Sequence, residues 1–380
     1  MRVRRCLALA FSVAVVTGAA GPAAAAAPET AWRLASIPQN KATSNLWDVA
    51  AVDGRNAWAV GFEGYHPDQP DTTGTPMMLR WNGFRWSRTS LPVVQGPVYF
   101  QRVAASSAKD VWVTGAPRSQ DGNVTLVWRY NGRAWTAVPY PPGATPGTLS
   151  IRDLSVVDGH AWLVGHHGNA PVFHEWTGTS WQEHQPPAEC VTGGGFLNFC
   201  TINTVKAFAP DDVWAAGNGM WNGFAGPLLF HWNGTSWRAV DIGLNQQQVT
   251  VQSLDGASSR DIWAVADGGG MGSANVVVRG DGTTWQTVSG LNTPATPGVA
   301  VGANGTPWVI GRIPAASFSS YGPAGWTTTL APSPSGLFGT NYNAIAAVPG
   351  TNRLIAVGAA DVPGTSPLLV QAVIAEYSTR

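Results

Sequence analysis

The sequence predicts an all-β fold, a seven-bladed β-propeller built from four-stranded antiparallel blades. The first observation behind this prediction is a tryptophan in a short apolar run, as in Ala57-Trp58-Ala59-Val60-Gly61, that returns about every fifty residues. The second is a tryptophan that follows a short polar turn in most repeats. The first position holds Trp58, Trp112, Trp162, Trp214, Trp263, Trp308 and Ile355, and the second holds Trp86, Trp135, Trp181, Trp237, Trp285 and Trp326. Short apolar runs at such a period are typical of propeller blades.

The fourth repeat shows how one blade is expected to form. Its predicted strands cover residues 204–208, 213–216, 228–232 and 236–240. The third and fourth of these strands are joined through Asn233-Gly234, a pair that favours a tight hairpin because both residues tolerate a positive φ. Four antiparallel strands in one repeat make a blade, and the tryptophans are expected to pack between blades.

The two ends of the chain are predicted to close the ring together. The last repeat supplies three strands and then ends without a fourth. Residues 31–37 resemble the outer strands of other blades, but no inner strands precede them. We therefore expect this segment to complete blade 7 by pairing with the strand that ends at Tyr377, with Trp32 as its outer tryptophan. Closure of this kind removes two exposed sheet edges.

The composition agrees with a single turn-rich β domain. Charged residues make up 12% of the chain, about half the usual share, and there are 45 glycines and 28 prolines. A closed ring of repeats is one cooperative body, so residues 28–380 are expected to form one domain despite their length.

The first 27 residues resemble a secretory signal peptide. Arg2, Arg4 and Arg5 form the charged start, residues 7–16 the apolar stretch, and residues 23–27 a small-residue cleavage region. Cys6 lies before the apolar stretch rather than after it, so no lipid anchor is expected, and no membrane-spanning segment follows. The protein is therefore predicted to be secreted.

Export also affects the expected charge and disulfide content. Without the leader the chain has about three more acidic than basic residues, which gives no electrostatic footprint for a nucleic acid partner. Of the three cysteines, Cys190 and Cys200 remain. An even pair in an oxidising compartment is expected to form a disulfide.

The repeats resemble those of kelch-type and galactose-oxidase-like propellers. The resemblance lies in a second strand that ends in glycine, as in Trp214-Ala215-Ala216-Gly217, followed by the hairpin Trp232-Asn233-Gly234-Thr235-Ser236-Trp237. The Gly-x-x-Trp of that hairpin, as in Gly282-Thr283-Thr284-Trp285, is also similar to the Asp-box of sialidases. This resemblance implies a propeller over nearly all of the mature chain.

Strand alternation predicts which face carries a binding site. Tight turns gather on one face, where Asp110, Asp212 and Asp261 are expected to cap the turns. The opposite face carries long and varied loops, at residues 62–76, 118–123, 166–169, 185–200, 218–227 and 333–342. Binding residues concentrate on variable loops held by a rigid scaffold, so the long-loop face is the candidate site.

The inner strands begin on this face, and their first residues are expected to ring the mouth of a central channel. In register these are Trp47-Asp48, Gln101-Arg102, Arg152-Asp153, Asn203-Thr204, Gln252-Ser253 and Asn343. Two arginines, two aspartates and a tryptophan would suit a sugar or a small carboxylated ligand. The alternative is that polar residues at a solvated rim have no ligand.

Two further residues complete the candidate ligand-binding set, which is Trp47, Asp48, Arg102, Arg152, Asp153, His166 and Trp221. His166-His167 is expected to lie in a solvated loop and not to bind a metal, because no third ligand is evident. Trp221 lies in a glycine-rich loop and either stacks on a sugar ring or covers a blade edge. No metal or cofactor is expected.

The sequence favours a secreted, non-catalytic binding protein for glycans or cell-surface partners. Phosphate loops, HExxH, dinucleotide fingerprints and GxSxG elbows are absent. The first alternative is an extracellular carbohydrate-active enzyme, a hydrolase or lyase, that uses Asp48, Arg102, Arg152 and Asp153. The second is a protein-interaction scaffold. The ligand, bound calcium and the oligomeric state are left open by the sequence.

Overall fold

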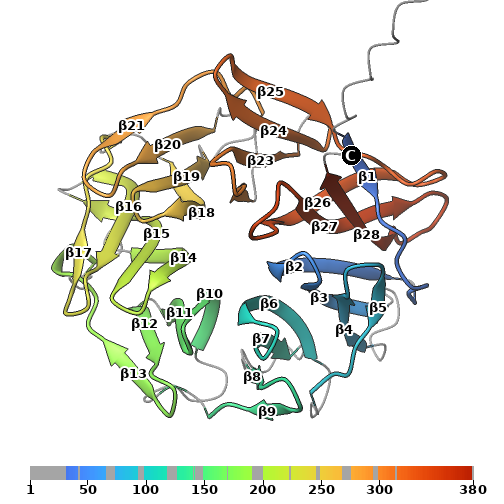
Figure 1. Cartoon of the computed structure of the whole chain (residues 1–380), viewed down its shortest axis with the longest axis horizontal. Helices are drawn as coiled ribbons and strands as arrows, with labels where there is room; N and C mark the ends of the chain where they lie inside the picture. The colour runs from blue at the N-terminus through green and yellow to red at the C-terminus, as the bar shows by residue number, and fades with distance from the viewer. Residues whose placement is uncertain are drawn as a thin grey trace, which may run out of the picture.

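The chain forms a closed ring of β-sheets (Figure 1), as predicted. The structure, a computed structural model, describes residues 31–41, 43–65, 73–92, 98–117, 126–139, 141, 149–168, 170–190, 200–221, 224–244, 249–267, 275–293, 298–312 and 315–378. These residues form seven four-stranded antiparallel sheets. A search of the same ranges finds no helix that could span a lipid bilayer.

Each blade runs from an inner strand at the channel to an outer strand at the rim. The first three blades are β2 (Ser44–Asp53), β3 (Asn56–Tyr65), β4 (Thr73–Trp81) and β5 (Trp86–Arg88); β6 (Val98–Ser107), β7 (Asp110–Pro117), β8 (Leu126–Tyr130) and β9 (Trp135–Ala137); and β10 (Leu149–Val157), β11 (His160–His167), β12 (Ala170–Trp176) and β13 (Trp181–His184). Blades 4 and 5 are β14 (Cys200–Ala209), β15 (Asp212–Trp221), β16 (Phe224–Trp232) and β17 (Trp237–Ala239); and β18 (Thr250–Ser258), β19 (Asp261–Asp267), β20 (Val276–Gly280) and β21 (Trp285–Thr287). Blades 6 and 7 are β22 (Val299–Val301), β23 (Pro307–Gly311), β24 (Ser317–Gly322) and β25 (Gly325–Leu330); and β26 (Phe338–Ala347), β27 (Leu354–Val362), β28 (Leu369–Ser378) and β1 (Ala31–Leu34).

The hydrophobic core lies between neighbouring blades, and the recurring tryptophans fill it. Trp162 of blade 3 is fully buried and packs against Trp232 and Trp237 of blade 4, at centroid distances of 5.4 and 5.6 Å. The equivalent side chains Trp58, Trp112, Trp214 and Trp263 are also buried. These tryptophans therefore belong to the scaffold rather than to a binding surface.

Charged side chains hold several of these tryptophans in place. Asp110 accepts hydrogen bonds from Nε1 of Trp112 (3.0 Å) and Nε of Arg129 (2.7 Å), and the guanidinium lies 5.3 Å from the Trp112 ring centroid. Asp212, Trp214 and His231 repeat the arrangement in blade 4, and Asp261 pairs with Arg279 over Trp263 in blade 5. The expectation that these aspartates only cap turns was therefore incomplete.

The ring closes between the N- and C-terminal strands, as predicted (Figure 1). Strand β1 pairs antiparallel with β28, with Trp32 opposite Tyr377, and the Trp32 ring stacks on Phe318 of blade 6 at 3.7 Å. The strand is shorter than the expected 31–37, since it ends at Leu34, and it is followed by a backbone hydrogen bond from the Ala35 N–H to the Ile374 carbonyl (2.8 Å). The chain then leaves blade 7 to begin blade 1.

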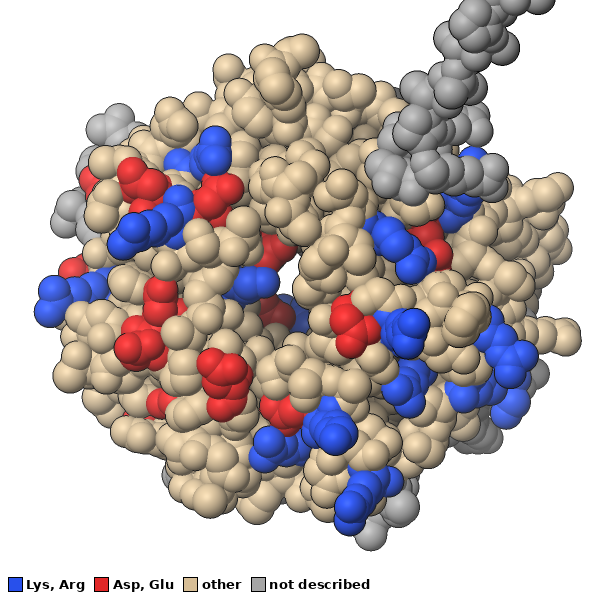
Figure 2. All heavy atoms as spheres, in the orientation of Figure 1, with Lys and Arg blue, Asp and Glu red and all other residues tan. Residues whose placement is uncertain are grey.

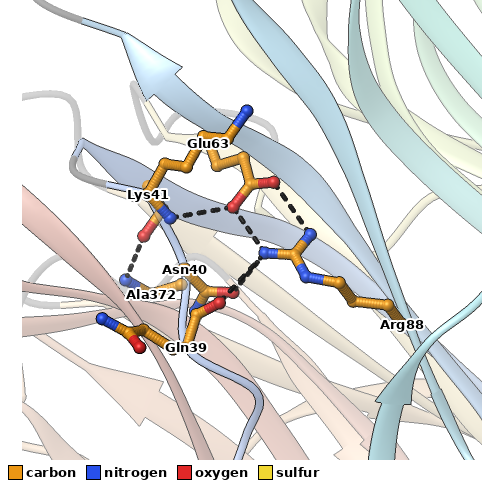
Figure 3. Close-up of polar contacts among 7 residues, drawn as sticks. Gln39, Asn40, Lys41, Glu63, Arg88 and Ala372 are labelled. Atoms are coloured by element: carbon orange, nitrogen blue, oxygen red, sulfur yellow. Dashed lines mark hydrogen bonds and ion pairs between the residues drawn. The ribbon is translucent and has the colours of Figure 1, made fainter.

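An ion pair between the buried Glu63 and the exposed Arg88 joins this departing segment to blade 1 (Figure 3). The Glu63 carboxylate accepts hydrogen bonds from both terminal nitrogens of Arg88 (2.8 and 2.6 Å) and from the Lys41 N–H (2.9 Å). Arg88 also donates to the Gln39 carbonyl (3.2 Å) and to Asn40 Oδ1 (3.4 Å). Burial opposes ionisation of Glu63, but these hydrogen bonds outweigh it and hold its pKa below the ordinary value.

The predicted disulfide is present. Cys190, at the end of a 3-10 turn (Ala188–Cys190), is bonded to Cys200 at the start of β14, and both residues are buried. The bond therefore bridges the passage from blade 3 to blade 4. The segment between the two cysteines lies outside the described residues.

Five of the predicted loops are partly strand, among them 62–76, whose first residues end β3, and 185–200, whose Cys200 begins β14. His166 and His167 end β11, Trp221 ends β15 with Phe224 as its partner across the ladder, and β26 begins at Phe338. Backbone pairing needs no apolar side chain, so glycine-rich and polar segments can continue a ladder beyond the hydrophobic run that predicts it. The predicted loop residues 66–72, 118–123, 169, 191–199 and 222–223, like the predicted signal peptide, lie outside the described residues.

Candidate functional site

The predicted mouth residues coincide with a repeated β-bulge. In six of the seven described inner strands the pairing register with the second strand skips one residue near the start of the inner strand. The skipped residues are Trp47, Gln101, Arg152, Asn203, Gln252 and Asn343. A bulge leaves its extra residue unpaired and turns the side chain away from its normal direction. The bulges therefore place these six residues at equivalent positions of their blades.

A glycine on the neighbouring strand makes room for the bulge. A Cβ at Gly61, Gly165 or Gly217 would overlap a backbone carbonyl of the adjacent inner strand, at Asn45, Ser150 and Thr201 respectively. Each of these glycines stands three residues after the recurring tryptophan. This spacing is the sequence signal that could have predicted the bulges.

The inner strands surround a central cavity of about 570 Å³. Figure 2 shows the hollow at the middle of the ring, with acidic and basic side chains at its wall. Among the bulge residues, Trp47, Asn203, Gln252 and Asn343 line this cavity. Volumes of this size accommodate small-molecule ligands.

Asp48 and Asp153 bridge neighbouring blades. Asp48 accepts the N–H of Val49 on its own strand and the N–H of Val103 on β6, both at 2.9 Å. Asp153 repeats this geometry in the next pair of blades, accepting the N–H of Leu154 and that of Val205 on β14, also at 2.9 Å. Each carboxyl group therefore joins two inner strands through the backbone.

Arg102 lies between these two carboxyl groups and continues the bridging. Its Nε donates to the Arg152 carbonyl at 2.7 Å and lies 3.8 Å from Asp153 Oδ1, and its Nη1 donates to the Gln101 carbonyl at 3.0 Å. Burial raises the pKa of Asp48 to about 7, although Arg102 and the Val103 N–H act in the opposite direction. Burial also raises the pKa of Asp153.

Bridges of the same kind continue around the ring. Asn203 donates to the Val251 carbonyl (3.1 Å), Ser253 accepts the Val299 N–H (3.0 Å), and Asn343 donates to the Leu46 carbonyl (2.8 Å). Polar side chains at the channel mouth thus join the inner strands of blade 4 to 5, 5 to 6 and 7 to 1. Much of the predicted polar rim therefore has a structural role.

A second group of side chains near the mouth does not bridge inner strands. The side chains of Gln101, Arg152 and Gln252 make no hydrogen bond to the described part of the chain, and those of Arg152 and Gln252 are exposed. Trp47 is half-buried in an aromatic cluster, edge-on to Phe62 at 5.3 Å and to Tyr99 at 5.7 Å. Within the described chain, these four side chains therefore do not join neighbouring blades by a hydrogen bond.

His166 lies beside Arg152, whereas Trp221 belongs to another blade. His166 pairs with Ser150 across β10 and β11 and is half-buried, and burial together with the charge of Arg152 lowers its pKa. Trp221 is the last residue of β15, and its side chain lies outside the described part of the structure. Among the described residues, no three His, Cys, Asp or Glu side chains are placed to hold a metal ion.

The chain thus belongs structurally to the seven-bladed β-propellers, and its similarity to known proteins lies in the fold. No family model matches the sequence, and no curated protein matches it. Three solved structures resemble it over most of both chains. They are YCF48 bound to D1 peptide (15% identity, 92% and 97% of the two chains, TM-score 0.57), the WD40 β-propeller domain of Doa1 (13%, 90% and 96%, 0.57), and the β-propeller domain of the Trilobed protease from Pyrococcus furiosus, which has an open velcro topology (9%, 90% and 95%, 0.55). The kelch-type resemblance stays a prediction.

Proposed function

We propose that this protein is a secreted, non-catalytic binding protein that takes a glycan or another polar extracellular ligand at the channel mouth on the long-loop face. The observation that carries the proposal is the set of bulge residues Trp47, Gln101, Arg152 and Gln252, whose side chains make no hydrogen bond within the described chain; Trp47 and Gln252 also line the central cavity. Surrounding strands hold them on a rigid scaffold, which is the arrangement a preformed binding site requires.

The chemistry of these four residues suits an oxygen-rich ligand. A guanidinium such as that of Arg152 forms paired hydrogen bonds with a carboxylate, and the amides of Gln101 and Gln252 can both donate to and accept from sugar hydroxyls. Trp47 adds an apolar surface at the cavity wall. Asp48, Arg102 and Asp153 would hold the shape of the channel mouth beneath the ligand, and the four bulge residues would contact the ligand.

The test is glycan-array binding by the wild type and by Trp47→Ala and Arg152→Ala. Both variants should lose binding by at least about tenfold, which corresponds to one lost charge-assisted hydrogen bond or aromatic contact. Arg238→Ala, at an exposed position on outer strand β17, is the matched control and should bind as the wild type does. Unchanged binding by both Trp47→Ala and Arg152→Ala would show that the ligand binds at another part of the protein.

The enzyme alternative has one observation in its favour. An Asp48 pKa of about 7 lies where a general acid would need it. Both oxygens of Asp48, however, accept backbone N–H groups at 2.9 Å, so the carboxyl group already holds two blades together. Release of reducing or unsaturated sugar by the wild type, lost in Asp48→Asn or Asp153→Asn, would favour the enzyme.

Two finer parts of the proposal rest on the sequence. We infer that residues 1–27 are removed during export, and the N-terminal mass of the protein recovered from the secretion medium tests this. We also infer that the repeats are divergent kelch-type repeats, on the strength of the glycine-ended second strand and the Asn-Gly hairpins. If the glycan array is blank and a pull-down from the medium recovers a protein, the scaffold alternative replaces glycan binding.

A further inference from the structure

One sector of the ring is almost free of charge. Between Gln286 and Asn352 the sequence contains a single charged residue, Arg312. This stretch supplies all of blade 6 and the inner strand of blade 7. Arg312 is half-buried and donates to Asn343 Oδ1 (2.7 Å) at the channel. In Figure 2 the part of the ring formed by β24 and β25 is correspondingly free of acidic and basic side chains, while both kinds are spread over the other blades.

The outer strand of this sector is also unusual. Strand β25 has six residues, whereas the other outer strands have three or four. Thr327, Thr328 and Thr329 are exposed, and Leu330 is 77% exposed. Natural edge strands are usually protected by short length, charge, proline or a bulge. Strand β25, with the sequence Gly-Trp-Thr-Thr-Thr-Leu, has none of these protections.

The register shows which backbone groups of β25 face outward. The Ala331 N–H bonds the Ala316 carbonyl at 2.9 Å, so in an antiparallel pair every second residue back along β25 also bonds inward to β24. The residues between them, Trp326, Thr328 and Leu330, therefore direct their N–H and C=O groups away from the sheet. No strand in the described part of the chain pairs with this edge.

We propose that β25 pairs with β25 of a second copy of this chain, antiparallel and across a two-fold axis at Thr328. The outward groups of Trp326, Thr328 and Leu330 are symmetric about Thr328, so each donor would meet an acceptor of the copy. A two-fold interface also brings a surface against itself, and any net charge would then repel its own image. The sector's lack of charge meets this requirement, and pairing would cover part of Leu330.

Analytical ultracentrifugation over a wide concentration range tests the proposal. The wild type should show a concentration-dependent dimer, because one strand pair is a small interface. Thr328→Lys, which places a charge on the edge, should abolish the dimer. Thr287→Lys, at an exposed position on outer strand β21, should leave it intact. A wild type that is monomeric at every concentration overturns the proposal, as does a dimer unchanged by Thr328→Lys.

If circular dichroism shows that Thr328→Lys is unfolded, a cross-linking experiment tests the proposed pairing of β25 instead. Thr328→Cys places two thiols opposite each other at the axis, where the separation of facing residues allows a disulfide. Oxidation should give a covalent dimer of Thr328→Cys and none of the control Thr287→Cys. Equal cross-linking of the two variants, or none in either, overturns the proposed pairing.

Discussion

At the scale of single residues, side chains at the channel mouth divide into those that hold the ring and those that face solvent. Asp48 and Asp153 each join two inner strands through paired backbone hydrogen bonds. Arg152, at an equivalent bulge, is exposed and uses only its carbonyl in this network. Similar polar residues in one ring therefore either bridge two inner strands or face solvent, depending on where the next strand lies.

The raised pKa of Asp48 predicts a pH effect on stability. Its folded pKa of about 7 exceeds the ordinary value of 3.8, so its proton stabilises the fold at pH values below the ordinary value, and this contribution is lost as the pH rises through about 7. Relative to that of Asp48→Asn, the free energy of unfolding of the wild type should fall by about 2–4 kcal/mol from about pH 5 to about pH 8, because one pKa unit corresponds to about 1.4 kcal/mol.

Thermal or urea unfolding of the two proteins at several pH values measures this difference. Groups other than Asp48, among them His166 and His174 with their lowered pKa values, titrate in both proteins and cancel in the comparison. Parallel stability curves for the wild type and Asp48→Asn would show that the carboxyl group keeps an ordinary pKa in the folded protein.

The residue-scale predictions from sequence succeeded where the repeat sets the position. Register along the repeats placed Trp47, Arg152 and Gln252 at equivalent points, and the structure gives each of them the same bulge. The hydrogen-bond partner of a side chain could not be predicted, because Asp48 bonds Val103, which is 55 residues away in the chain. Such a contact depends on how adjacent blades are rotated, which no local pattern encodes.

At the scale of elements, ring closure depends on one short strand. Strand β1 covers the edge of β28, and its Trp32 packs on Phe318 of blade 6. Trp32→Ala should lower the free energy of unfolding by about 3–5 kcal/mol, as for other packed tryptophans. Leu34→Ala, at a position in the same strand that is 38% exposed, should have little effect. Urea unfolding compares them, and equal stability of the two variants would contradict the closure.

The disulfide gives a second prediction for a connecting element. Replacing both Cys190 and Cys200 by serine should lower the free energy of unfolding by about 2–4 kcal/mol, the usual effect of opening a short loop. Reductant should destabilise the wild type by a similar amount and leave the double variant unchanged. If reductant destabilises both proteins alike, its effect does not act through this bond.

Strand existence was predictable from sequence, but strand length was not. The expected first strand of blade 4, residues 204–208, lies inside the longer β14 (Cys200–Ala209). Its start places the polar residues Thr201, which pairs with Asn218, and Asn203, which donates to the Val251 carbonyl, next to the buried Cys200 and Ile202. Hydrophobic pattern marks the buried part of a strand, so strands that run on toward the channel mouth appear as loops.

For the molecule as a whole, the features that all blades share form the channel, and blade 6 differs from the other blades. Seven similar blades bury their tryptophans against one another and leave a central channel lined in part by Gln252, while Arg152 is exposed at the equivalent bulge of blade 3. Blade 6 departs from the others in charge and in the length of β25. The ring therefore offers two distinct surfaces, one proposed for a polar ligand and one for a second copy.

Isothermal titration tests whether the ligand binds at the channel mouth. The glycan that binds best on the array would be titrated into the wild type, Arg152→Ala and the outer-strand control Arg238→Ala. We expect Arg152→Ala to weaken binding at least about tenfold with an unchanged melting temperature, and Arg238→Ala to bind as the wild type does. Equal affinity of all three proteins would contradict binding at the channel mouth.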